Sequence, residues 1–322
     1  MSRYEVLPDL WCFKDTCNVY VLKEGSHAVA VDFGSGEWLS ELPDMGIDKL
    51  DHVFLTHHHA DQCFGLQNQG REDCIVHAPV GEDAFLDPAK VGEPQYFCPY
   101  ERGCPRSYAV LERGIPGITY DMKPNGHFFW GERRIRFVST PGHSPDACSI
   151  VMDQANRQVV LCGDAAFPGG RLWQPYHLEW DHWTGRGALA AWEGVVRLKN
   201  IAIDVLGPAH GDVVEEEPAE QLHELSERLL AFYHAKGAVS AGEKDRYVAS
   251  RAVTQNVRQI SEHLFHLGAN SYLLLSETDK CLIIDADGVV ERGISELRSS
   301  FPGIDPEALL VTHYHVDHCR QA

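Results

Sequence analysis

Long hydrophobic runs are missing from this sequence. No stretch approaches the roughly 18 apolar residues of a membrane-spanning helix. The first five residues, Met-Ser-Arg-Tyr-Glu, also lack the basic-then-apolar layout of a secretory signal. These absences predict a cytoplasmic protein with no membrane partner. The hydrophobic fraction of 44% and the charged fraction of 23% are ordinary globular values, which exclude disorder or coiled coil as the main architecture.

Positive charge is scarce. Lysine and arginine number 28 against 47 aspartates and glutamates, which gives a formal net charge of -19. A protein binds a polyanion through lysine and arginine side chains that release its counterions. The charge balance therefore argues against nucleic acid and an anionic membrane as partners, and it leaves a small-molecule substrate as the expected one. The charge balance does not predict an oligomeric state.

Paired cysteine motifs are also missing. Ten cysteines are present, but none forms a Cys-x-x-Cys pair, so we expect reduced thiols, several of them buried. Histidine is abundant instead, with 18 residues. Because histidine is the commonest metal ligand and acid–base group, the positions of the histidines carry the functional argument.

The chain contains an incomplete internal repeat. Its 322 residues have the length of about two domains. Three segments recur in order at an almost constant offset: residues 18–22, 28–32 and 50–57 return as residues 270–274, 281–285 and 308–313. We therefore expect a complete domain over residues 1–237, a linker over 238–253 and a truncated N-terminal part of a second domain over 254–322.

The second copy stops a few residues after His318. A domain cut there exposes strand edges and an apolar sheet face. We expect the chain to be a piece of a longer tandem protein. The alternative is a half-domain that pairs with a partner chain.

The first copy alternates between predicted strands and helices. Short β-branched or apolar runs bounded by glycine, aspartate or other polar residues predict strands, and apolar residues at helical spacing predict helices. The strands are expected at residues 18–22, 28–32, 52–56, 135–139, 159–162 and 201–206, and the helices at residues 61–69, 187–199 and 218–236.

Metal-binding residue types follow four of these strands. They are His57, His59, Asp61, His143, Asp164 and His210. Loops at one end of a sheet converge, so we expect these side chains to meet. His57 and His59 lie two residues apart, so an extended segment places both imidazoles on one side. With His143 they suit Zn²⁺ with one position open for water.

The other residues of this group suggest a second ion. Asp61, Asp164 and His210 are the candidates to hold it, with Asp164 placed to bridge both ions. Two ions a few Å apart could share a hydroxide and stabilise charge on a carbonyl or phosphoryl oxygen.

On these residues the sequence resembles the metallo-β-lactamase superfamily, over residues 1–236 and again over 254–322. The resemblance rests on Asp32, His57-x-His59-x-Asp61, His143 in Thr-Pro-Gly-His, Asp164 in Gly-Asp-Ala and His210 in Gly-Pro-Ala-His-Gly.

The resemblance implies an α/β fold of the four-layer αββα sandwich type. It also implies one metal on His57, His59 and His143, another on Asp61 and His210, and Asp164 between the two. Asp32 would lie next to the ligand residues and hold them in position without binding the metal itself. An aspartate rather than a cysteine at position 164 resembles the glyoxalase II and lactonase branch.

One residue departs from the family pattern. The motif normally ends in Asp-His, but here Gln62 follows Asp61. A carboxamide oxygen is a weaker zinc ligand than imidazole, so Gln62 is a doubtful ligand and the second site should bind zinc less tightly. The second copy keeps the full pattern in His313, His315, Asp317 and His318, but it lacks the later ligands, so this metal cluster is incomplete.

We predict a metal-dependent hydrolase of an ester, thioester, lactone or similar small carbonyl compound. A metal-bound hydroxide attacks the carbonyl, and Asp61 acts as the catalytic residue that takes the proton. The expected cofactor is one or two Zn²⁺, with iron or manganese as options. The segment 79–130 and the aromatic run between residues 167 and 183 are expected to line the pocket.

Two alternatives stay open. The first is a mononuclear iron dioxygenase that uses His57, His143 and Asp164, which a weakened second site would suit. The second is a non-catalytic, degenerate first copy in a tandem protein, motivated by Gln62. A nuclease is disfavoured by the charge of -19.

Overall fold

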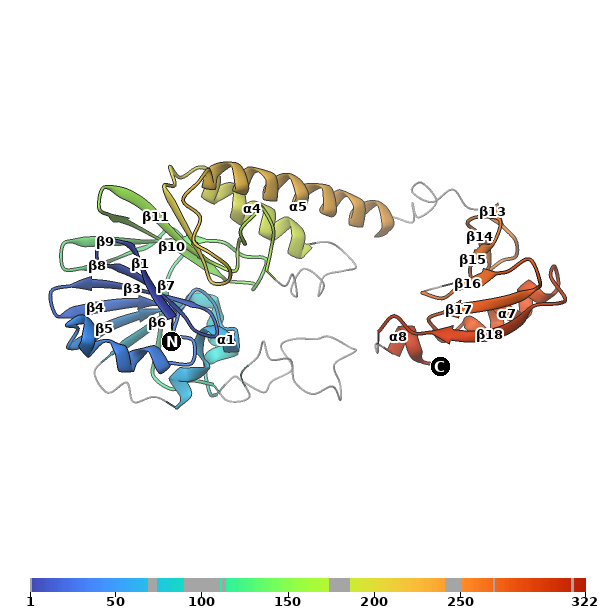
Figure 1. Ribbon diagram of the computed structural model, residues 1–322, viewed down its shortest axis with the longest axis horizontal. Helices are drawn as coiled ribbons and strands as arrows, with labels where there is room; N and C mark the ends of the chain where they lie inside the picture. Colours follow the sequence, from blue (N-terminus) through green and yellow to red (C-terminus); the bar gives the residue numbers. More distant parts are fainter. Residues whose placement is uncertain are drawn as a thin grey trace. The chain divides into compact units, whose positions relative to one another are not determined.

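The computed structural model divides the chain into two compact units, Met1–Gly237 (unit 1) and Ala238–Ala322 (unit 2) (Figure 1). The structure describes residues 2–68, 74–89, 111, 114–173, 186–240, 251–268, 270–313 and 316–322. No helix within these ranges is both long and apolar enough to cross a membrane.

Unit 1 contains two β-sheets. The first has seven strands in chain order, antiparallel from β1 to β4 and parallel from β4 to β7. They are β1 (Ser2–Leu7), β2 (Leu10–Lys14), β3 (Asn18–Glu24), β4 (His27–Val31), β5 (Lys49–Phe54), β6 (Ile75–Pro79) and β7 (Ile118–Met122).

The second sheet of unit 1 has five strands in the order β12-β11-β10-β9-β8, and only the β11–β12 pair is parallel. They are β8 (His127–Trp130), β9 (Arg133–Ser139), β10 (Cys148–Gln154), β11 (Arg157–Gly163) and β12 (Val205–Pro208).

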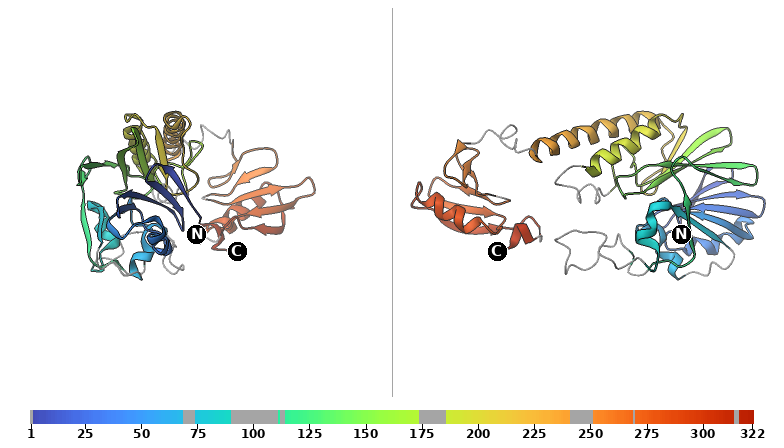
Figure 2. Two further views of the ribbon diagram at one scale, coloured as in Figure 1. Left: turned by 60° about the vertical axis from the view of Figure 1, so that its left-hand side comes forward. Right: turned by 180° about the vertical axis from the view of Figure 1, so that it is seen from behind.

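Helices lie outside both sheets of unit 1, as two views show (Figure 1, Figure 2). The second sheet is covered by α4 (Arg186–Lys199) and α5 (Pro218–Ser240), whose apolar side chains share a core with β10 and β11. The short helices on the side of the first sheet are η1 (Glu37–Glu41), η2 (Pro43–Met45), α1 (Ala60–Cys63), η3 (Phe64–Gln67), η4 (Val80–Glu82) and α2 (Asp83–Leu86).

Alternate side chains along a strand of the first sheet pack into two different hydrophobic cores. Val19 and Val21 of β3 pack into the core between the first sheet and its helices. Tyr20 and Leu22 of the same strand face the core between the two sheets, because successive strand side chains point to opposite faces. The α/β class expected from the sequence is confirmed.

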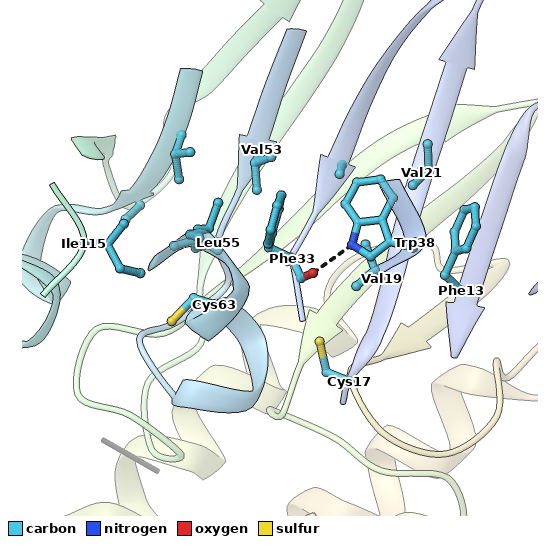
Figure 3. Close-up of a cluster of buried hydrophobic side chains, with 14 of the residues drawn as sticks. Phe13, Cys17, Val19, Val21, Phe33, Trp38, Val53, Leu55, Cys63 and Ile115 are labelled. Carbon is cyan, nitrogen blue, oxygen red and sulfur yellow. Dashed lines mark hydrogen bonds between the residues drawn. The ribbon is translucent and has the colours of Figure 1, made fainter. Parts of the chain in front are cut away.

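Trp38 anchors η1 on the first sheet. Its ring is fully buried against Phe13 and Phe33, with centroids 5.7 and 5.6 Å away. Its indole Nε1 donates a 2.8 Å hydrogen bond to the backbone oxygen of Phe33, which Figure 3 shows. This contact holds the segment that follows β4, where Asp32 lies.

The helix expected at 61–69 is two shorter helices, and that prediction was wrong in extent. The α-helical part, α1, stops at Cys63, and a 3-10 helix, η3, continues to Gln67. At Gly65 the backbone lies so close to Ser35 that a Cβ would come within 2.2 Å of the Ser35 oxygen. This close packing requires a glycine at position 65.

The strand expected at 201–206 begins only at Val205. Parallel pairing with β11 starts there, since Val205 is the partner of Val159. Just before it, the Asp204 carboxylate accepts a hydrogen bond from the Gln158 backbone at 2.8 Å. Sequence reasoning also missed six strands of unit 1: β1, β2, β6, β7, β8 and β10.

Unit 2 is a six-stranded sheet with a core of its own. Helix α5 extends to Ser240, into the region expected to be the linker. The elements of unit 2 are β13 (Arg251–Ala252), β14 (Arg258–Gln259), β15 (Leu264–His266), β16 (Tyr272–Leu275), β17 (Lys280–Ile284), α7 (Val290–Arg298), β18 (Asp305–Leu310) and α8 (Val316–Cys319).

The pairing of unit 2 matches part of unit 1. Strands β17 and β18 are parallel with a register shift between Cys281 and Leu282, and β4 and β5 have the same shift between Ala28 and Val29. The burial of the two sheets differs. Leu274 is 41% exposed, whereas Leu22, at the matching position, is 2% exposed. The described residues of unit 2 include no second sheet that could cover this face.

Candidate metal centre

The predicted ligands of unit 1 lie in loops that follow strand ends. The histidines His57 and His59 occupy the turn between β5 and α1, and His143 lies between β9 and β10. Asp164 follows β11 directly, and His210 comes two residues after β12. The first sheet and the second sheet both contribute, so the centre lies where the carboxyl ends of their strands meet.

Three imidazoles and one carboxylate form a buried group. The Nε2 atoms of His57 and His143 lie 3.4 and 3.2 Å from Asp164 Oδ2. The His143 Nε2 also lies 2.9 Å from His59 Nδ1. All four residues are buried, and their ligand atoms lie within 4.8 Å of one another. Three histidine nitrogens with one carboxylate oxygen are a donor set that suits zinc.

A second group shares Asp164 and is more open. It consists of Asp61, Asp164 and His210. The His210 Nε2 lies 2.8 Å from Asp61 Oδ2 and 3.8 Å from Asp164 Oδ1. The side chains of His210 and Asp61 are 13% and 22% exposed. Burial opposes the charged form of His210, but the Asp61 hydrogen bond and the charges of Asp164, Asp61 and Asp32 raise its pKa overall.

The centre contains a buried carboxylate oxygen that makes no hydrogen bond with the described residues, Asp164 Oδ1. A buried carboxylate oxygen without a donor costs free energy unless another charge compensates it. A cation held by this donor set would supply that charge. The residues present therefore fit a bound metal ion.

The comparisons with known proteins agree with this geometry. A family model described as Metallo-beta-lactamase superfamily matches residues 13–210 and 265–322. The chain belongs to this superfamily. It is a metallo-hydrolase of the metallo-β-lactamase fold, as the sequence predicted, and its group of His57, His59, His143 and Asp164 resembles a zinc site. No curated protein matches the sequence.

Solved metallo-β-lactamase structures share the fold at low sequence identity. A mutant Cronobacter sakazakii enzyme with a HARLDQ motif is 14% identical with a TM-score of 0.54, covering 76% of this chain and 99% of that chain. BJP-1, a subclass B3 enzyme of Bradyrhizobium japonicum, is 15% identical with a TM-score of 0.51, covering 76% and 96%. LRA-12, a class B3 di-zinc enzyme from an Alaskan soil metagenome, is 12% identical with a TM-score of 0.51, covering 73% and 94%.

Asp32 supports this metallo-β-lactamase centre through Thr56. The Asp32 carboxylate accepts hydrogen bonds from the Thr56 backbone at 2.8 Å and from its hydroxyl at 3.0 Å. The same hydroxyl lies 3.0 Å from His57 Nδ1, so the chain Asp32–Thr56–His57 orients the imidazole. Burial raises the pKa of Asp32 to about 8.

Glu82 is a supporting residue that sequence reasoning missed. It is fully buried, and its Oε2 accepts hydrogen bonds from the His58 backbone at 2.9 Å and from His58 Nδ1. Its other oxygen accepts one from the Ser144 hydroxyl at 2.8 Å. Glu82 therefore ties the loop of His57 and His59 to the loop of His143. No motif points to it, because its partners lie far away in the sequence.

Gln62 lies inside the second group. The whole residue is buried, and its Nε2 is 3.2 Å from Asp61 Oδ2, 3.3 Å from Asp164 Oδ2 and 3.5 Å from His210 Nε2. Its nitrogen, not its oxygen, faces the second ligand set. The sequence predicted the carboxamide oxygen of Gln62 as a doubtful ligand, whereas the structure turns the nitrogen to this side.

The second copy of the motif is only partly described. His315 lies outside the described residues. Asp285 accepts hydrogen bonds from the Thr312 backbone at 2.8 Å and from His318 Nδ1 at 2.8 Å, and the Thr312 hydroxyl lies 3.0 Å from His313 Nδ1. The described residues of unit 2 form no group of three metal-ligand types, and Asp317 bonds instead to Asn270.

Part of the predicted pocket lies outside the described residues, namely residues 90–110, 112–113 and 174–185. Within the described part, the Trp173 ring stacks on His210 with centroids 4.7 Å apart and also on Phe167 at 5.3 Å. Two aromatic rings thus form an apolar wall beside the more exposed metal group.

Proposed function

We propose that this protein is a metal-dependent hydrolase of a small carbonyl compound such as an ester, thioester or lactone. The observation that carries the proposal is the position of Asp164, whose carboxylate belongs to both ligand groups. The buried histidine group supplies the cation site, and the partly exposed Asp61 and His210 give a substrate access from one side.

The residues divide the work. His57, His59 and His143 would hold the cation, which would supply Lewis acidity and lower the pKa of water. The Asp61 carboxylate would accept the proton that the water loses, at Oδ2, which lies 2.8 Å from His210 Nε2. Trp173 beside His210 offers an apolar surface to the substrate and excludes water.

The branch of the superfamily belongs to the same proposal. We place the protein with the glyoxalase II and lactonase enzymes, because position 164 is an aspartate rather than a cysteine. The solved structures that share its fold include B3 metallo-β-lactamases. A panel containing a thioester, a lactone, an aryl ester and a chromogenic cephalosporin distinguishes this branch from the β-lactamases, since a β-lactamase would favour the cephalosporin.

The proposal is tested by removing ligands. His57→Ala and His143→Ala should each reduce turnover of the best panel substrate by a factor of about 10³ or more, because the cation is lost, while far-UV circular dichroism stays unchanged. His127→Ala, on an exposed position of β8, serves as the control and should keep full activity. Full activity in both ligand variants would refute the hydrolase.

A mononuclear iron dioxygenase remains a second candidate because Gln62 alters the second ligand group. Imidazole and carboxylate ligands also suit iron, and manganese is a further option. Iron in the purified protein together with oxygen uptake on a thiol-derived substrate would support this candidate. Zinc with hydrolysis and no oxygen uptake would exclude it.

We also propose that unit 2 repeats the N-terminal part of unit 1. The family model matches residues 265–322 as well as unit 1, and the Asp285–Thr312–His313 contacts match Asp32–Thr56–His57.

A non-catalytic unit 1 is less favoured than the hydrolase, since its ligands other than Gln62 still gather in two groups.

A further inference from the structure

The side-chain nitrogen of Gln62 occupies the middle of the second ligand group. It lies within hydrogen-bond distance of all three members, at 3.2 Å from Asp61, 3.3 Å from Asp164 and 3.5 Å from His210. Gln62 is completely buried. A single donor group therefore contacts Asp61 Oδ2 and His210 Nε2, which a second cation would need. It contacts Asp164 at Oδ2, the oxygen that also faces His57 and His143.

The chemistry of the amide decides what this position means. An amide nitrogen has two N–H donors and no lone pair for a metal. It donates to the two carboxylates and so compensates part of their negative charge without an ion. Zinc in the second group would compete with these hydrogen bonds at Asp61 Oδ2 and Asp164 Oδ2.

Turning the amide around does not create a good zinc site. The oxygen would then face the carboxylate oxygens of Asp61 and Asp164, and acceptors repel one another. An amide oxygen suits calcium or magnesium better than zinc, which prefers nitrogen and sulfur. With the nitrogen inward, the amide makes two hydrogen bonds to carboxylates and leaves only Oε1 without a partner among the described residues, so this orientation is the favoured one.

Unit 2 shows what an imidazole does at the matching position. The backbone oxygens of Gln62 and His318 accept equivalent hydrogen bonds, from Phe33 at 2.8 Å and from Ala286 at 2.6 Å. The His318 ring is held by Asp285 at Nδ1, which turns its Nε2 toward Asp317 Oδ2 at 3.6 Å. The matching backbone position thus carries an imidazole nitrogen that can bind a metal in unit 2, from His318, and an amide N–H donor in unit 1, from Gln62.

We propose that the Gln62 amide substitutes for the second metal ion, so that unit 1 holds one cation, on His57, His59 and His143. This inference rests on the proposed function and deepens it. Asp61 and His210 then serve as hydrogen-bonding groups for substrate and water rather than as metal ligands. The side chain at position 62 therefore determines how many metal ions unit 1 binds.

Zinc counting on the full chain tests the inference. Each variant is loaded with zinc chloride, dialysed against metal-free buffer and measured by mass spectrometry. In the natural sequence, His57→Ala should lose about one zinc per chain and His210→Ala none. Gln62→His should gain about one zinc, which His210→Ala should then remove. Any zinc on unit 2 is common to all variants and cancels in the differences.

Two further variants sharpen the test. Gln62→Glu keeps the shape of the side chain but supplies a carboxylate ligand, so it should also gain about one zinc, even if the imidazole variant fails to fold. Asn68→His adds an imidazole at an exposed position in the same segment and should gain none. Cobalt loading gives an independent readout, because the visible absorption per protein should rise in the Gln62 variants alone.

The outcomes separate this inference from the hydrolase itself. Loss of zinc in His210→Ala on the natural sequence would overturn the inference while the hydrolase stands. So would an unchanged zinc count in both Gln62→His and Gln62→Glu, if circular dichroism shows them folded. An unchanged zinc count in His57→Ala would refute the metal site on which the proposed function depends.

Discussion

At the scale of single residues, Glu82 joins the two loops that carry the three histidine ligands. Its carboxylate is buried and accepts hydrogen bonds from His58 and Ser144, each next to a ligand in the sequence. The stacking of Phe85 on the His58 ring, with centroids 4.2 Å apart, further fixes this corner. Residues behind metal ligands tune the affinity of a site because they orient the donor atoms.

Glu82→Gln should weaken zinc binding by about 10- to 100-fold without loss of the fold, since an amide has one acceptor oxygen where the carboxylate uses two. The zinc dissociation constant is measured by competition with a chelator, and folding by circular dichroism. Glu37→Gln, at an exposed position of η1, is the matched control. A normal zinc affinity in Glu82→Gln would show that Glu82 only fills space.

At the scale of elements, the end of β11 supports the end of β5. Gly163 closes β11 with a positive φ of 55°, and a Cβ on it would lie 2.7 Å from the Thr56 hydroxyl oxygen. That hydroxyl bonds both Asp32 and His57. The close approach of the two strand ends thus sets the orientation of a ligand histidine.

Gly163→Ala should lower zinc affinity, because the new methyl group pushes Thr56 away from His57. Gly131→Ala is its control: it has a similar φ of 57°, but a Cβ added there would meet no atom within 4 Å. Both variants carry the backbone strain of about 1–2 kcal/mol, so a fall in zinc affinity in Gly163→Ala alone isolates the contact. Equal zinc affinity in the two variants would contradict this account.

Strands β5, β6 and β7 form a second polar network away from the metal centre. His52 Nδ1 lies 3.0 Å from His77 Nε2, whose other nitrogen lies 3.0 Å from Asp121. Burial, together with the nearby His77, lowers the pKa of His52. Lys49 also opposes a charge there, whereas Asp51 and Asp121 favour it.

Stability should therefore fall as the pH drops below the ordinary histidine pKa of about 6.5. There the unfolded chain takes up a proton at His52 that the folded protein resists, so protonation favours unfolding. His52→Gln should show a smaller drop in melting temperature between pH 7.5 and 5.5 than the natural protein. An equal drop in both proteins would exclude His52 as a cause, and His127→Gln controls for the loss of a surface histidine.

At the scale of the whole molecule, the two units have separate cores. Among the described residues, unit 1 holds three hydrophobic clusters, and unit 2 holds one that includes Phe265, Leu273 and Leu297. All seven tryptophans of the chain belong to residues 1–237. Tryptophan fluorescence therefore reports the unfolding of unit 1, whereas circular dichroism and calorimetry report both units.

Leu273→Ala should destabilise unit 2 by about 2–5 kcal/mol, because it removes a fully buried side chain and leaves a cavity. The unfolding midpoint seen by tryptophan fluorescence should not move, while a calorimetric transition shifts to lower temperature. Leu274→Ala, on the 41% exposed neighbour, should shift neither. A shift of the fluorescence midpoint in Leu273→Ala would mean that the units unfold together.

The local pattern of the sequence determined much of this protein. The order of apolar runs and the histidines and aspartates that follow them predicted the ligand loops. The recurrence of residues 28–32 at 281–285 predicted a second copy, which stays a proposal supported by the register shift that β4–β5 and β17–β18 share. Such features depend on neighbouring residues and on strand periodicity, which are visible in a linear chain.

Only the tertiary structure decided three other features. It brought Glu82 to His58 and Ser144, it turned the nitrogen of Gln62 toward Asp61 and Asp164, and it buried Leu22 while leaving Leu274 exposed. Each depends on contacts between residues far apart in the chain. Propensity and spacing contain no record of those contacts, because long-range packing selects one partner among many that are locally equivalent.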